Sequence, residues 1–220
     1  MARGIWTRRN AIIHGEDFDH HNAIVRRAVE SLDQFRLVQD ASRINDENTR
    51  PSKEEKWMNP PSGRHKANWD IAIDTKQKRM GLGVIIRDEK ELVTAALSRT
   101  MDILQEPTVG EAMGALGVAE FSKDIGISNI ILEGDFKQVV EAVTSKGSSM
   151  SKYGHIIGDI HEVLKVFRRW DIRHVKRIAN EATHVLAKSA TKEIGERIWL
   201  EDTPNIIFDV VTLEQFALSV

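Results

Sequence analysis

The sequence predicts an α/β fold, in which one mixed sheet of five strands is flanked by helices and preceded by an N-terminal helical extension. Three stretches with strand periodicity, joined by short polar connections over residues 68–97, predict an antiparallel meander. Two further strand patterns, 130–132 and 171–175, each follow a helical pattern. Strands reached through helices extend a sheet by crossover connections, which are right-handed as a rule. The content of 41% hydrophobic residues is sufficient for one core.

Residues 1–65 differ in composition from the rest of the chain. A helical pattern places apolar residues on one stripe: Ile24, Val25, Ala28, Val29, Leu32 and Phe35. The chain is then polar from Asp40 to Lys56 and reaches Pro60-Pro61. We interpret residues 1–65 as an extension of helix and linker, 66–193 as the main domain and 194–220 as a C-terminal tail. Because a lone amphipathic helix cannot bury its own stripe, it must dock on the main domain, on another chain or on a region missing here.

The first half of the main domain reads as strand, strand, strand, helix. Trp69, Ile71 and Ile73 alternate with smaller or polar residues, and strands follow at 81–87 and 92–97. Pro107 is typical of a helix start, and the helical pattern continues to about residue 126. This helix carries three glycines, each of which costs about 1 kcal/mol relative to Ala in a helix interior. We therefore expect it to approach the sheet closely at Gly110, Gly114 and Gly117.

The second half reads as strand, helix, helix, strand, helix. A short buried strand at 130–132 precedes a helix that opens at Asp135, and a second helix spans 153–167. The alternating strand at 171–175 then leads to a last helix beginning near Asn180. The predicted order is therefore β-β-β-α-β-α-α-β-α.

Composition and charge exclude several classes of protein. The chain has no cysteine, which excludes a disulfide framework and cysteine-ligated zinc and fits a reducing compartment. Its apolar runs are far too short for a membrane span, so we expect a soluble intracellular protein. We also expect it to be located in the nucleus or cytosol and to be a monomer. The net charge of −2 gives no global basic field, so any nucleic-acid contact must be local.

Four residues at separate element ends could carry chemistry: Asp70, Glu111, Asp135 and His184. Asp70 lies among apolar residues of a predicted central strand, where an unpaired carboxylate is costly, and this favours a functional role. Asp135 also fits a helix cap, with Gln138 completing a capping box. Glu111, one turn into a helix, also fits a solvated residue or a partner of the helix dipole. His184 could bind a metal, position a water, shuttle a proton or have no role.

Several tracts, in this order and at these intervals, identify a family. They are Asn68-Trp69-Asp70, Gly81-Leu82-Gly83-Val84-Ile85-Ile86-Arg87-Asp88, Glu111-Ala112 with Leu116, Leu132-Glu133-Gly134-Asp135, Tyr153-Gly154-His155-Ile156-Ile157, His174-Val175, and Arg177 and Asn180 with Leu186-Ala187-Lys188. From about residue 66 onward the chain resembles the ribonuclease H type 1 domain of plant proteins descended from non-LTR retrotransposons. Residues 5–10 resemble the tail that joins such domains to an upstream region of the parent element.

The resemblance implies a metal-dependent endonuclease that hydrolyses the RNA strand of an RNA–DNA hybrid. Asp70, Glu111 and Asp135 would bind Mg²⁺, or Mn²⁺, and form the catalytic set with the residue at position 184. The candidate substrate-binding residues are Asn68, Arg177 and Asn180, with Arg177 at a phosphate.

The chain departs from the family pattern at two positions. The family has an acid where this chain has His184, and imidazole brings no negative charge and suits Mg²⁺ less well. The family usually has glycine where this chain has Ile71, whose branched side chain we expect to crowd the backbone near the metals. These departures favour an alternative function, a catalytically weak or inactive domesticated relative that acts as a nucleic-acid-binding or protein-interaction module.

Overall fold

The computed structural model describes residues 56–102, 106–145 and 152–218. The chain divides into two compact units, 1–49 and 50–220, and the described residues all belong to the second. The helix predicted around residues 24–35 lies outside the described residues. Within the described ranges, no helix combines the length and the apolar character needed to cross a membrane.

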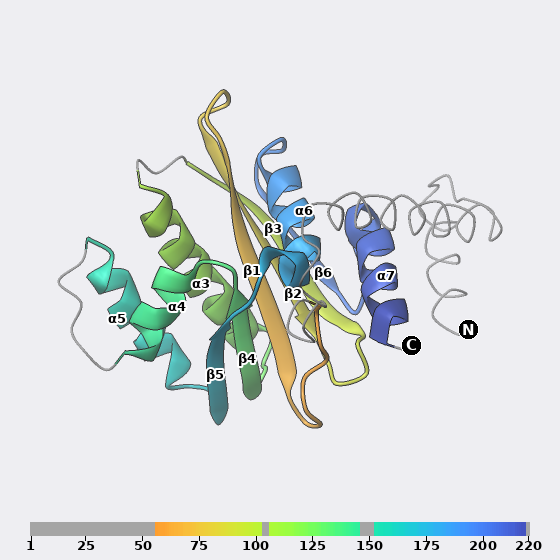
Figure 1. The fold of residues 1–220 in the computed structure, drawn as a ribbon. Helices are drawn as coiled ribbons and strands as arrows, with labels where there is room; N and C mark the ends of the chain where they lie inside the picture. The colour runs from red at the N-terminus through yellow and green to blue at the C-terminus, as the bar shows by residue number, and fades with distance from the viewer. Residues whose placement is uncertain (1–55, 103–105, 146–151, 219–220) are drawn as a thin grey trace, which may run out of the picture. The chain divides into compact units, whose positions relative to one another are not determined.

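One mixed sheet forms the centre of the second unit. Its strands are β1 (His65–Asp74), β2 (Arg79–Arg87), β3 (Val93–Asp102), β4 (Asn129–Gly134), β5 (Arg169–His174) and β6 (Glu196–Leu200). Their spatial order is β5-β4-β1-β2-β3-β6, with β1 between a parallel neighbour, β4, and an antiparallel one, β2 (Figure 1). The predicted meander β1-β2-β3 and the strands added through crossovers are confirmed.

Helices cover both faces of this sheet. They are α3 (Pro107–Asp124), α4 (Lys137–Thr144), α5 (Gly154–Leu164), α6 (Glu181–Ala190) and α7 (Phe208–Leu218), with short 3₁₀ turns η2 (Arg177–Asn180) and η3 (Asn205–Ile207). Helices α3, α4 and α5 lie on one face and α6 and α7 on the other (Figure 1). The larger core lies under α3, α4 and α5, and a smaller one lies between the sheet and α6 with α7.

Strand periodicity assigns the side chains of β1 to the two faces. Trp69 and Ile71 enter the larger core under α3, and neither is more than 8% exposed. Asp70 lies between them in sequence, so its side chain points to the opposite face, where α6 lies.

Two glycines of β2 let α6 lie directly on the sheet. A Cβ atom on Gly81 would lie 2.2 Å from the carbonyl oxygen of Ala187, and one on Gly83 would lie 2.4 Å from that of Thr183. Both contacts are with helix backbone, so no side-chain adjustment could relieve them. The position of α6 over β1 and β2 is therefore set by the backbone.

The expected close approach of α3 to the sheet is also confirmed. Added Cβ atoms on Gly110, Gly114 and Gly117 would lie between 2.7 and 2.9 Å from side chains of β1 and β2.

The sheet has six described strands where the sequence predicts five. The additional strand β6 and helix α7 come from residues 194–220, which we expected to be a tail. Strand β6 is a short edge strand with mostly exposed side chains, so it lacks clear strand alternation. The apolar residues of α7 are spread around the helix, so its sequence shows no single stripe.

Candidate active site

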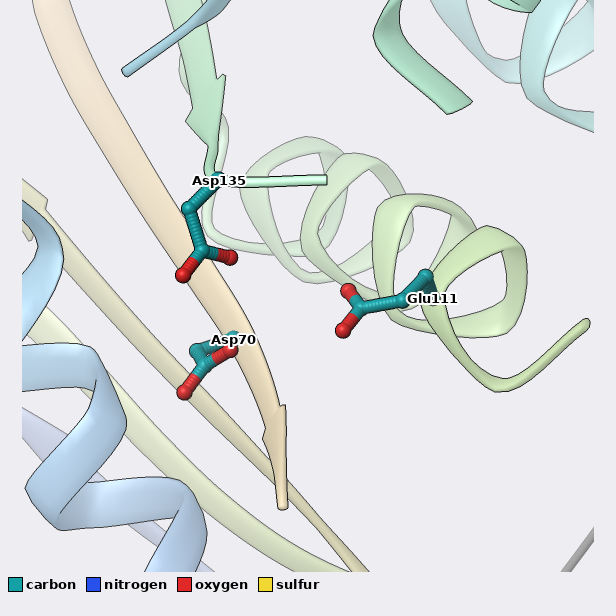
Figure 2. Close-up of side chains that lie close together, drawn as sticks. All are labelled: Asp70, Glu111 and Asp135. Carbon is teal, nitrogen blue, oxygen red and sulfur yellow. The ribbon is translucent and has the colours of Figure 1, made fainter. Parts of the chain in front are cut away.

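Three carboxylates from three different elements meet beside strand β1. Asp70 comes from the middle of β1, Glu111 from the beginning of α3, and Asp135 directly follows β4 (Figure 2). One oxygen from each lies within 4.8 Å of the others. The convergence predicted from the sequence is therefore confirmed.

The donor set fits a hard divalent cation. Asp70 is 1% exposed and Glu111 is 9% exposed. Oδ1 of Asp70 and Oε2 of Glu111 are buried and have no hydrogen-bond partner among the described residues. A buried carboxylate oxygen without a partner is costly, and Mg²⁺ and Mn²⁺ are cations that such oxygens bind. Asp70 and Glu111 could thus hold metal with oxygens that the described residues leave without a partner, and Asp135 could complete the set.

Proton affinities at the site reflect burial and crowding. Burial, followed by the negative charges of Asp70 and Asp135, raises the pKa of Glu111 to about 8. The pKa of Asp70 is raised by burial and then by Asp135, against the lowering effects of His184 and Arg177. For both residues burial contributes more to the raised pKa than repulsion between carboxylates does.

Asp135 does not cap the following helix. Helix α4 begins at Lys137 with Phe136 in the capping position, and no side chain caps it. The interpretation of Asp135 as a cap with a capping box is therefore wrong. Its carboxylate is directed toward Asp70 (Figure 2), and its own carbonyl oxygen lies 3.2 Å from Nε2 of His174.

Gly134 allows β4 to end beside Trp69 of β1. A Cβ atom on Gly134 would lie 2.3 Å from the ring of Trp69, its register partner on β1. Asp135 can therefore follow β4 at the edge of the site only because residue 134 has no side chain.

His184 lies where the resemblance places the fourth acid. Its Nδ1 atom is 2.8 Å from Oδ2 of Asp70, and Nη2 of Arg177 contacts both ring nitrogens, Nδ1 and Nε2. We assign a hydrogen to Nδ1, because the Asp70 carboxylate accepts hydrogen bonds. The imidazole thus takes part in the site from α6.

Arg177 brings a positive charge to the same carboxylates. Its Nη1 atom lies 3.4 Å from Oδ2 of Asp135, and Nη2 lies 3.8 Å from Oδ2 of Asp70. The side chain is 54% exposed. Its predicted contact with a substrate phosphate stays a prediction, and the residue stands at the open side of the site.

The other two predicted substrate-binding residues are buried. Asn180 is 2% exposed and donates from Nδ2 to the carbonyl oxygen of Trp69 at 2.7 Å, which ties the start of α6 to β1. Asn68 is 1% exposed and bonds to Trp57 and Glu133. These contacts give both residues a structural role, and binding of substrate by either one stays a prediction.

Ile71 does not crowd the site. A Cβ atom added to Gly114 would lie 2.9 Å from Cγ1 of Ile71, so the isoleucine side chain fills the space beside that glycine. It lies in the core under α3, on the face of β1 opposite to Asp70. The expectation of crowding is wrong because side chains alternate along a strand.

Trp57, Lys66 and Glu133 belong to the surroundings of the site, although sequence reasoning assigned them no role. All three are buried and connected to Asn68 or to one another. A tryptophan in an otherwise polar stretch, just before Pro60-Pro61, was the available signal for Trp57.

Solved structures show the same fold. RNase H1 of the archaeon Halobacterium salinarum NRC-1 is 24% identical with a TM-score of 0.54, over 59% of this chain and 98% of that one. The N-terminal RNase H domain of a Mycobacterium tuberculosis protein, fused to maltose-binding protein, is 17% identical with a TM-score of 0.52, over 59% and 94%. LC11-RNase H1, solved in complex with an RNA/DNA hybrid, is 16% identical with a TM-score of 0.52, over 58% and 96%. At these identities the likeness establishes the fold, which is that of ribonuclease H.

A comparison with curated protein sequences finds no match. A family model described as reverse transcriptase-like matches residues 68–190, which span β1 to α6 and include all four candidate catalytic residues. Since the match covers more than half of the 220 residues, the chain belongs to the reverse transcriptase-like family, with a ribonuclease H-like domain.

Proposed function

We propose that this protein is a divalent-metal-dependent endonuclease that hydrolyses the RNA strand of RNA–DNA hybrids. The observation that carries the proposal is the convergence of Asp70, Glu111 and Asp135, with buried oxygens of Asp70 and Glu111 unpartnered among the described residues. Support also comes from the fold it shares with structures named RNase H1, one of which was solved with an RNA/DNA hybrid.

Asp70, Glu111 and Asp135 would hold Mg²⁺ or Mn²⁺. Bound there, divalent metal would lower the pKa of a water nucleophile and stabilise the leaving oxygen of the phosphodiester. Asp70 would be the central ligand, because it also contacts His184 and Arg177.

The chain's own side chains have distinct parts in this reaction. His184 orients the Asp70 carboxylate through its Nδ1–H, and Arg177 contacts the same ring. Arg177 is exposed beside the carboxylates, where a guanidinium can bind a phosphate of the RNA strand. Recognition of the strand would rest on 2′-hydroxyls and backbone shape, since no sequence-reading element is needed for a hybrid duplex.

Hydrolysis of an end-labelled RNA–DNA hybrid tests the proposal directly. With Mg²⁺ or Mn²⁺ the wild type should cleave the RNA strand internally, and chelation by EDTA should stop it. Asp70→Asn should lose cleavage by at least a hundredfold, because it removes the central ligand's charge, while single-stranded RNA and duplex DNA serve as substrate controls. Cleavage that persists unchanged in Asp70→Asn would place the activity elsewhere.

A second candidate is a silent module that binds nucleic acid or protein. The contacts of Arg177 and His184 with Asp70 favour it, because they already supply the carboxylate with a positive charge and a hydrogen bond. Hybrid binding of equal affinity in wild type and Asp70→Asn, without cleavage in either metal, would select this candidate.

We also propose that the chain is retroelement-derived and of plant type, monomeric, and located in the nucleus or cytosol. The family match supports the first point, and the absence of cysteine fits a reducing compartment. Light scattering of the purified protein and microscopy of a tagged form would test the oligomeric state and the location.

A further inference from the structure

A second row of polar side chains lies directly behind the carboxylates. Asn68 on β1 and Glu133 on β4 are register partners in the parallel pairing of the two strands. They stand two residues before Asp70 and Asp135, respectively, and Nδ2 of Asn68 donates to Oε2 of Glu133 at 3.3 Å. Because side chains repeat with a period of two, Asn68 shares a face of β1 with Asp70.

The side chains of this row are buried, and their polar atoms form hydrogen bonds or ion pairs. Trp57 is 2%, Asn68 1% and Glu133 4% exposed. Nε1 of Trp57 donates to Oδ1 of Asn68 at 3.0 Å, and Nζ of Lys66 lies 2.9 Å from Oε1 of Glu133. We call Trp57, Asn68 and Glu133 the polar ladder.

The ladder allows one orientation of the Asn68 amide. An indole N–H can only donate, so the amide oxygen must face Trp57 and the amide nitrogen must face Glu133. Each of these bonds crosses from one segment to another, and together they connect residue 57, β1 and β4 in a fixed order.

Trp57 is held in turn by Arg87 of β2, which pairs with a residue near the other end of the chain. The guanidinium carbon of Arg87 lies 3.6 Å from the centre of the Trp57 ring, and the Arg87 guanidinium pairs with Glu214 of α7. Trp57 and α7 both lie outside residues 68–190, the part matched by the family model. The flanking segments therefore brace the strands that carry the carboxylates.

The carboxylates create a need for such a brace. One carboxylate oxygen of Asp70 and one of Asp135 lie within 4.8 Å of each other, so without a cation two like charges face each other across β1 and β4. Repulsion between two paired strands favours their separation, and a one-residue slip would turn the side chains to the wrong face. The ladder joins the same two strands through Asn68 and Glu133, two residues before each carboxylate.

We propose that Trp57, Asn68 and Glu133 are positioning residues of the metal centre, which hold β1 and β4 in the register that presents Asp70 and Asp135 together. The inference rests on the proposed function in that these carboxylates are taken to bind metal. It differs from a role in fold stability alone, because it requires the metal affinity of folded molecules to depend on the ladder.

A charge exchange within the ladder provides the main test. Asn68→Asp sets two buried carboxylates against each other, and the Asn68→Asp, Glu133→Gln double variant restores one donor, one acceptor and the original charge. Calorimetry on the full chain measures the Mn²⁺ dissociation constant. Asn68→Asp should bind Mn²⁺ about tenfold more weakly than the wild type, as is typical when residues behind the metal ligands are changed. The double variant should recover to within about threefold of the wild-type dissociation constant. An added negative charge acting only through space would tighten binding instead, so tighter binding in Asn68→Asp overturns the proposal.

Trp57→Phe provides a milder variant in case Asn68→Asp does not fold. It keeps an aromatic ring beneath Arg87 and removes only the N–H that orients Asn68. Mn²⁺ binding should weaken several-fold, whereas Trp199→Phe, the same exchange on β6, should bind as the wild type does.

The possible outcomes separate the two claims. Ladder variants that melt at lower temperature but keep the wild-type Mn²⁺ dissociation constant overturn positioning and leave a role in stability. A wild type that binds no Mn²⁺, or binds it as Asp70→Asn does, refutes the proposed metal site, and the positioning role falls with it.

Discussion

Nδ1 of His184 lies 2.8 Å from Oδ2 of Asp70, so α6 meets β1 at the site through an imidazole. The guanidinium of Arg177 contacts both nitrogens of the same ring. The site therefore has three carboxylates and a hydrogen-bonding ring in the place where the resemblance predicts a fourth negative charge. Its affinity for metal should depend on this difference.

Replacing His184 by Asp should tighten Mg²⁺ binding about tenfold and increase Mg²⁺-dependent cleavage, because a further carboxylate is added beside Asp70. The wild type should accordingly work better with Mn²⁺, which accepts imidazole more readily. Calorimetry and cleavage rates in both metals measure the effects. His184→Asn, which adds no charge, is the control, and equal Mg²⁺ affinity of the two variants would show that charge at position 184 has no influence.

The metal-free protein should lose stability as the pH rises from about 4.5 to about 8, the ordinary and folded pKa values of Glu111. In this window the folded state holds a proton that the unfolded state releases, so deprotonation favours unfolding. Glu111→Gln should flatten this fall and be more stable than wild type at pH 8.5 in EDTA, by on the order of a few kcal/mol. Urea unfolding of both proteins at pH 5 and 8.5 measures the free energy of unfolding. Glu120→Gln, an exposed position on the same helix, should retain the wild-type slope.

Gly134→Ala should destabilise the protein by about 1–3 kcal/mol and weaken Mn²⁺ binding, since a Cβ atom would lie 2.3 Å from the Trp69 ring and displace the end of β4. Thermal unfolding and calorimetry measure the two effects. Gly158→Ala on α5 is the matched control: a Cβ atom there has no neighbour within 4 Å, so stability should be unchanged or slightly higher. Normal Mn²⁺ binding in Gly134→Ala would show that Asp135 tolerates movement of β4.

Ile71→Ala should destabilise the protein by about 2–4 kcal/mol without changing the Mn²⁺ dissociation constant, because Ile71 is 8% exposed and packs under α3, on the face of β1 opposite to Asp70. Ile73→Ala, at a position of the same strand that is 39% exposed, should cost much less. Chemical unfolding with parallel calorimetry tests both. A clear gain of metal affinity or cleavage in Ile71→Ala would mean that the isoleucine does hinder the site.

Much of the fold follows from local patterns. The alternation around Trp69 and Ile71 predicted strand β1, and the glycines of α3 indicated its close approach to the sheet. Asp70 was identified by its position among apolar residues of a strand, whereas Glu111 and Asp135 were assigned to the site by the tracts that carry the family resemblance. Such signals are contained within a few neighbouring residues.

The remaining features depend on partners far apart in the sequence. The amide of Asn180 bonds to a backbone group 111 residues away, and that of Asn68 to a side chain 65 residues away, so their burial has no local signature. Strand β6 is recognisable only through its pairing with β3. The cap interpretation of Asp135 failed for a related reason, because a capping sequence does not fix which residue the first turn of helix begins with.

Helix α6, which carries His184, contacts Gly81 and Gly83 of β2 through its backbone. The placement of position 184 beside Asp70 therefore does not depend on which side chain stands there. Since backbone atoms set the distance between α6 and the sheet, a change of side chain at position 184 should leave α6 in the same position on β1 and β2. Different groups can then be presented to Asp70 at nearly constant geometry. If the carboxylates bind metal as proposed, substitutions at residue 184 should change the metal preference without changing the fold.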